Sequence, residues 1–154
     1  MKISILLPYK ENFSPTYAGA VSLFVKDTTQ ISKFKKYITV FGNTDLKNIY
    51  KLKYKNIFLK KNLVQSGSAV YVNEFLKHEI ESPSNIIEIH NRPNYFHLIF
   101  KKLKNKKIVL YFHNDPLTMT GSRSVVDRKK LLDKAAKIIF NSHWSRKRFL
   151  EGIE

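Results

Sequence analysis

His113 is the residue best placed for chemistry in this sequence, because it directly follows the apolar, β-prone run Ile108–Phe112. A histidine at such a position can exchange a hydrogen bond or a proton with a reacting group near neutral pH. Asn114 and Asp115 follow it, and a loop rich in Thr, Ser and Gly then leads to Arg123. A satisfied structural histidine is the competing interpretation, and the polar residues that follow favour the functional one.

A second polar group, His90, Asn91 and Arg92, comes after the apolar run Ile86–Ile89. These side chains suit contacts to hydroxyl groups or anions. Pro93 is typical of the first position of a helix, so the same residues are equally expected as caps of that helix. Both interpretations stay open on the sequence alone.

Two further positions border predicted helices. Gly19 precedes a helical pattern, and a glycine there lets backbone amides approach a phosphate, although the sequence has no G-x-G-x-x-G and no P-loop. A glycine that only permits close packing is an equally good interpretation. After the run Ile138–Phe140 come Asn141 and Ser142, and the serine is a good N-cap for a final short helix.

Metal and nucleophile chemistry is poorly supported. The five histidines are dispersed, there is no H-E-x-x-H, and the chain has no cysteine. No G-x-S-x-G is present to anchor a catalytic serine. We therefore expect no metal and no resident cofactor.

Six apolar runs must position these residues, and several are nearly continuous, as in strands covered on both faces. Helical patterns separate them, which predicts βαβ units and an α/β, Rossmann-like, three-layer α/β/α domain with a mostly parallel sheet of order 3-2-1-4-5-6. The carboxyl ends of such strands share one sheet edge, where ligands bind. The predicted strands are Ile3–Leu7, Tyr37–Phe41, Ile57–Leu59, Ile86–Ile89, Ile108–Phe112 and Ile138–Phe140.

Four stretches carry the helical spacing of apolar residues. The last of them opens with Ser124 and Asp127, an S-x-x-D capping signal. The others contain Val21–Thr28, Val72–Glu79 and Phe96–Leu103.

The charge balance indicates an anionic partner or surface. The 154 residues hold 28 Lys+Arg and 12 Asp+Glu, a formal net charge of +16. Lysines at Lys47–Lys61 and Lys101–Lys107 are the candidate patch for anionic membrane lipids. No apolar run reaches the roughly 18 residues of a membrane span, and Met1–Tyr9 lacks a cleavage-site pattern. We expect a cytoplasmic protein, with peripheral attachment at the inner face of the membrane as an open alternative.

Four segments resemble the N-terminal half of a GT-B glycosyltransferase of group 1, the family 4-like, retaining kind. They are KISILLP, EIHNRP, LYFHNDP with its TMTGSRS loop, and KIIFNSHWSRKRFLEG. The last two are the most specific and span Ile108–Gly152 almost without a gap, whereas Gly42–Gly67 matches only by element type. The resemblance implies that residues 1–154 form the Rossmann-like N-terminal, acceptor-side domain, without the C-terminal donor-binding domain and its acidic E-x7-E motif.

In that family the complete enzyme transfers a hexose from a nucleotide sugar to a glycan or a lipid-linked acceptor, in lipopolysaccharide or cell-surface polysaccharide synthesis. The resemblance implies that this chain alone is inactive. One departure is Ala18-Gly19-Ala20, where the family has a double glycine. The implied roles are His113 as the catalytic residue at the donor sugar, Gly19 near the donor phosphates, Asn141 and Ser142 at the cleft, and Asn91, Arg92 and Arg123 at the acceptor.

Two other functions compete with this hypothesis. A basic nucleic-acid-binding α/β module would explain the charge and the aromatics among lysines at Tyr50–Lys61, but no recognised module of that kind appears. A stand-alone nucleotide-binding Rossmann protein would need the glycine fingerprint and an acid after the second strand. We therefore expect no nucleic-acid partner.

Overall fold

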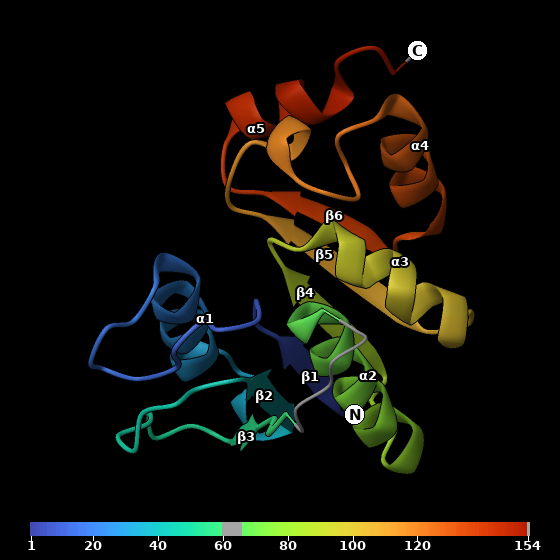
Figure 1. Cartoon of the computed structure of the whole chain (residues 1–154). Helices are drawn as coiled ribbons and strands as arrows, with labels where there is room; N and C mark the ends of the chain where they lie inside the picture. Colours follow the sequence, from blue (N-terminus) through green and yellow to red (C-terminus); the bar gives the residue numbers. More distant parts are fainter. Residues whose placement is uncertain (60–65, 154) are drawn as a thin grey trace. The chain divides into compact units, whose positions relative to one another are not determined.

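A computed structural model describes residues 1–59 and 66–153 (Figure 1). Its strands follow the order β3-β2-β1-β4-β5-β6 in a six-stranded sheet, which confirms the predicted Rossmann-like topology. The pairs β1–β2, β2–β3, β4–β5 and β5–β6 are all parallel. The strands are β1 Ile3–Leu6, β2 Ile38–Gly42, β3 Tyr54–Asn56, β4 Ile86–His90, β5 Lys107–Phe112 and β6 Lys137–Phe140.

Ser124 and Ser142 cap their helices as the sequence predicts, and Ser66 caps a helix in the same way. Ser66, Ser124 and Ser142 each accept a hydrogen bond on the hydroxyl from a backbone amide of the first helical turn. Pro93 opens its helix, as predicted. None of the helices in the described ranges has the length and apolar character required to cross a membrane. The helices are α1 Ala20–Ile31, α2 Gly67–Glu81, α3 Pro93–Lys102, α4 Val125–Lys134 and α5 His143–Leu150, with short 3-10 turns at Lys35–Tyr37 and Pro116–Thr118.

The chain divides into two compact units, Met1–Asn85 and Ile86–Glu154. In the first unit, helices cover both faces of the strands. Ile5 and Val40 pack with Val25 of α1 in one buried cluster. On the opposite face the ring of Phe41 meets that of Phe75 on α2, with centroids 5.1 Å apart. The nearly continuous apolar runs of β1 and β2 are therefore explained by burial on both sides.

In the second unit, the alternation of side chains along β4 and β5 separates an apolar face from a polar one. On the apolar face Phe112 stacks on Phe140, and both rings contact Phe149 of α5. The opposite face carries His90 beside Tyr111, which are direct partners in the parallel register. The polar face is the one that leads to the candidate site.

The prediction for the third strand is wrong. The strand is Tyr54–Asn56 rather than Ile57–Leu59. Tyr54 turns its hydroxyl to Thr44 and Asn56, so an alternating lysine–tyrosine segment pairs with β2 without an apolar run. Ile57 is buried, yet it follows the strand and donates its amide to the carbonyl of Gly42. The part of Lys47–Lys61 beyond Leu59 lies outside the described residues.

Candidate functional site

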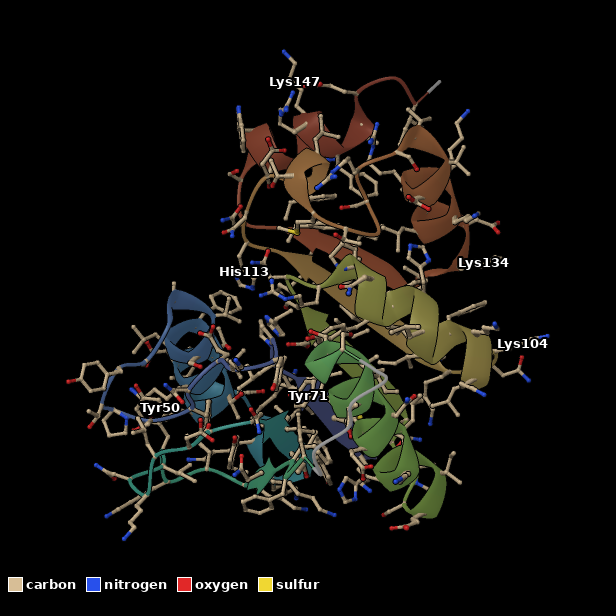
Figure 2. All side chains as sticks on the ribbon, viewed as in Figure 1. Tyr50, Tyr71, Lys104, His113, Lys134 and Lys147 are labelled. Atoms are coloured by element: carbon tan, nitrogen blue, oxygen red, sulfur yellow. The ribbon has the colours of Figure 1, made fainter. Side chains whose placement is uncertain are left out.

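His113 lies directly after β5 (Figure 2), and hydrogen bonds hold its main chain on both sides. Its amide donates to Oδ1 of Asn91 at 3.2 Å. Its carbonyl accepts from Nδ2 of Asn141 at 2.8 Å. The ends of β4, β5 and β6 are therefore tied together at this histidine, and the backbone that carries its ring is fixed by groups from both neighbouring strands.

Asn91 owes this role to its backbone conformation. Its φ is +56°, in the left-handed region that asparagine tolerates better than most residues. The side chain is buried, and its Oδ1 also accepts from the amide of Asn114 at 3.3 Å. The structure thus gives Asn91 a positioning role at the end of β4. Its predicted contact to an acceptor stays a prediction.

The ring of His113 belongs to a chain of polar contacts on the polar face of β4 and β5. Its Nε2 lies 2.9 Å from Nδ1 of His90. Nε2 of His90 in turn lies 2.7 Å from Oε1 of Glu88. The ring of Tyr111 stacks on that of His90 with a centroid distance of 4.6 Å. From the sequence, His90 was expected only as part of a polar group for hydroxyl or anion contacts, and Glu88 was assigned no role.

The pKa of His113 is lowered from its ordinary value of 6.5 to about 4. Burial is the larger cause, and the neighbouring His90 adds to the shift. The neutral imidazole is therefore the form present at neutral pH. A neutral ring can accept or donate a hydrogen bond without carrying charge into the site.

We expect the stability of the fold to fall as the pH drops from 6.5 towards about 4. In that window the unfolded chain protonates His113 while the folded chain does not, so protons favour unfolding; above the window this group has no effect. Urea midpoints at steps across the window should fall further for the wild type than for His113→Gln. Parallel pH profiles for the two proteins would contradict the lowered pKa.

Asn141 and Ser142 lie beside an open groove along β6. Its volume is about 400 Å³, and residues Lys137–His143 together with Arg146 line it. Ser142 caps α5 by accepting from the amide of Ser145 at 3.1 Å. Asn141 and Ser142 are both exposed. Through its hydrogen bond to the carbonyl of His113, Asn141 links this groove to the main chain of that histidine.

The two predicted arginines lie in different loops. Arg92 is half-buried, and its guanidinium donates to the carbonyl of Asn91 at 2.8 Å. Arg123 is exposed and donates to the carbonyl of Thr118 at 3.3 Å. The structure therefore brings Arg92 to the end of β4 near the Asn91 backbone, and leaves Arg123 at the end of the loop before α4.

Gly19 belongs to the first unit, where it precedes α1 as predicted. Oε1 of Glu11 accepts from the amide of Ser22 at 3.0 Å. A Cβ built at Gly19 would overlap the Glu11 carboxylate. The N-terminus of α1 thus already holds a carboxylate from its own loop, and a phosphate would have to displace it. Sequence reasoning missed Glu11, whose only signal is an acid in the loop before Gly19.

No metal ligand set is found in residues 1–59 and 66–153, where no three His, Cys, Asp or Glu side chains are grouped to hold an ion. The polar face instead offers hydrogen-bonding groups: the two imidazoles and the Glu88 carboxylate. This set is suited to orienting a polar ligand.

Comparison with known proteins supports the fold. No protein-family model matches the chain, and no curated protein matches its sequence. Among solved structures, the UDP-GlcNAc 2-epimerase from Methanocaldococcus jannaschii is similar, with a TM-score of 0.51 and 16% sequence identity. The match covers 100% of this chain and 43% of the epimerase chain. The chain therefore has the Rossmann-like fold of one GT-B half and spans less than half the length of that structure.

Proposed function

We propose that this chain is the acceptor-side half of a retaining glycosyltransferase that moves a hexose from a nucleotide sugar to a glycan or lipid-linked acceptor. The observation that carries the proposal is the position of His113. It lies at the carboxyl end of β5 in a GT-B-like half, with its main chain held by Asn91 and Asn141. Ligands of open α/β sheets bind at this edge.

The chemistry of glycosyl transfer fits a neutral histidine at that place. Positive charge builds on the sugar ring in the transition state, and negative charge builds on the departing phosphate. A neutral His113 positions the sugar by hydrogen bonding without placing a second positive charge beside the ring. Groups that stabilise the departing nucleotide would come from a second half, so turnover under this proposal needs both halves.

The proposal extends to the partners. The exposed lysines Lys47, Lys51, Lys53 and Lys55 carry no acid between them and would attract the anionic leaflet in which a lipid-linked acceptor lies. A nucleotide sugar would meet the site of His113 from the carboxyl edge of the second unit's strands. Gly19 would meet the donor phosphate only after Glu11 has moved.

We expect UDP-GlcNAc or UDP-glucose, added to the isotope-labelled chain, to shift the backbone amide NMR signals of His113, Asn114 and Asn141. UDP alone should shift them less, because the sugar makes the contact. The binding is expected to be weak, since half of the cleft is proposed to lie on another domain.

Two variants and one competitor sharpen this experiment. His113→Ala should remove the response of Asn114 and Asn141, while His78→Ala on α2 should leave it intact. An RNA oligonucleotide should not compete. If RNA shifts these amide signals and neither nucleotide sugar does, the result contradicts the proposal and favours the nucleic-acid hypothesis.

A further inference from the structure

Trp144, the only tryptophan of the sequence, lies on the first turn of α5, which follows β6 directly (Figure 1). It is 57% exposed, whereas Ser145 and Phe149 of the same helix are buried. Tryptophan has a large apolar ring, and it is enriched among the residues that contribute most to binding. An indole ring is therefore exposed at the carboxyl edge of the second unit's strands, where ligands of such sheets bind.

The indole ring is supported by Arg148, one helical turn further along α5. The guanidinium carbon lies 5.9 Å from the ring centroid, which is a cation–π contact. Nε and Nη2 of Arg148 donate to Oδ2 of Asp115 at 3.3 and 3.1 Å. Nη1 donates to the two carboxylate oxygens of Glu151 at 2.8 and 2.7 Å. Because two carboxylates hold the guanidinium, the ring beside it is restricted before any ligand arrives.

The same contacts connect Trp144 to the main chain around His113. Asp115 follows His113 by two residues, and its side chain caps the 3-10 turn Pro116–Thr118. Asn141, two residues before α5, donates to the carbonyl of His113. Short hydrogen-bonded segments of one unit therefore join the exposed ring to the candidate site.

The charges beside the ring favour an uncharged ligand over a phosphate. The guanidinium of Arg148 already pairs with Asp115 and Glu151, and these carboxylates repel anions. The Asp115 side chain is 20% exposed, and a carboxylate accepts about four hydrogen bonds, so Asp115 can accept from further hydroxyl groups. One face of a sugar ring presents apolar C–H groups that suit the face of an indole, while the rim of the sugar carries hydroxyl groups. An indole beside an accessible carboxylate fits both features.

We propose that Trp144 is a stacking platform for a sugar ring, and that Asp115, oriented by Arg148, accepts hydrogen bonds from the hydroxyl groups of that ring. On the proposed function, on which only this role rests, the ring belongs to the glycan acceptor, and the donor sugar lies at His113. Arg146, on the same helix, is exposed, so a nucleic acid that stacks a base on the indole is the competing ligand in the test.

The intrinsic fluorescence of the chain reads this site directly, because Trp144 is the only source of tryptophan emission. Methyl β-glucoside or methyl β-galactoside should shift the emission to shorter wavelength and reduce its quenching by acrylamide, since a stacked sugar excludes water from the ring. Mannitol, an open-chain polyol, and inorganic phosphate should change neither property.

Variants separate the ring from the carboxylate. Asp115→Asn should raise the dissociation constant of the glycoside about tenfold, because hydrogen bonds to a charged group are lost. Asp27→Asn, at an exposed ion pair on α1, is the matched control and should leave the titration unchanged. In Trp144→Ala the glycosides should no longer shift the amide NMR signals of Leu117 and Ser145.

An emission of Trp144 that neither glycoside changes would overturn the proposal, as would an equal response to mannitol or to phosphate. Quenching by an RNA oligonucleotide and by neither glycoside would overturn it as well. Equal affinities of the wild type and Asp115→Asn would remove the role of Asp115. If the glycosides bind at Trp144 while the nucleotide sugars leave the signals of His113 unchanged, the sugar platform stands and the proposed function fails. The reverse pair of results overturns only the platform.

Discussion

Replacing Gly121 with alanine should lower the free energy of unfolding by about 2–4 kcal/mol. Gly121 has φ +95°, which side chains rarely adopt, and a Cβ there would lie 2.5 Å from the backbone nitrogen of Asn94. Backbone atoms at the start of α3 cannot move aside as a flexible side chain would. The substitution therefore combines backbone strain with an overlap that only a shift of the whole loop relieves.

Gly152 offers a matched control for this experiment. Its φ is +70°, but a Cβ there would meet only a methyl group of Val125 at 3.3 Å. Gly152→Ala should thus show the strain alone, about 1 kcal/mol. Urea unfolding of both variants separates the two effects. Equal losses for Gly121→Ala and Gly152→Ala would show that the contact with Asn94 relaxes without cost.

Gly121→Ala should also disturb the loop that follows His113. The carbonyl of Gly121 accepts a hydrogen bond from Nε2 of His97 at 2.8 Å. Ser122 Oγ donates to the carbonyl of Pro116, and Arg128 donates to the carbonyl of Ser122. The main-chain carbonyls of the loop that follows His113 are therefore held by side chains of α3 and α4, and moving Gly121 loosens several of these hydrogen bonds together.

Local signals explain why much of this fold was predictable. Ser124 and Ser142 cap helices through amides only a few residues away, and Pro93 fixes a helix start by its own geometry. The apolar runs of β1 and β2 are buried because helices and a neighbouring strand cover them, those of β4 and β5 alternate between buried and half-buried residues, and that of β6 is half-buried. The position of the third strand was predicted wrongly, because Tyr54–Asn56 is stabilised by hydroxyl and amide contacts with Thr44 rather than by apolar residues.

The candidate site was predictable only in part, because its decisive contacts are long-range. The sequence predicted that His113 and Asn91 end neighbouring strands. That Asn91 Oδ1 would accept from the His113 amide, 22 positions away, depends on the strand register and on a positive φ. Glu88 and His90 are two residues apart, a spacing that places them on the same face of a strand. One such polar pair within an apolar run does not show that this face meets another histidine.

Glu79 shows the same limit within the first unit. Its spacing aligned it with Val72, Phe75 and Leu76 on a helix face whose last turn was expected to be polar. The structure buries Glu79 to 2% exposure. Its carboxyl oxygens accept from Ser4 Oγ of β1 at 2.5 Å, from Ser84 Oγ at 2.8 Å and from the Ser84 amide at 3.1 Å. One side chain therefore ties α2 to β1 and to the segment before β4.

Glu79→Ala should lower the free energy of unfolding by about 2–4 kcal/mol, because it leaves the buried donors of Ser4 and Ser84 without this acceptor and opens a cavity. Glu79→Gln should cost only about 1 kcal/mol. Its amide oxygen can accept from both Ser84 donors, while its NH₂ group donates to the Ser4 hydroxyl, which reverses its role. Urea unfolding of the two variants, combined with Ser4→Ala in a double-mutant cycle, measures the contribution of the Ser4 contact. Nearly equal losses for alanine and glutamine would mean that the charge of Glu79, rather than its hydrogen bonds, stabilises this junction.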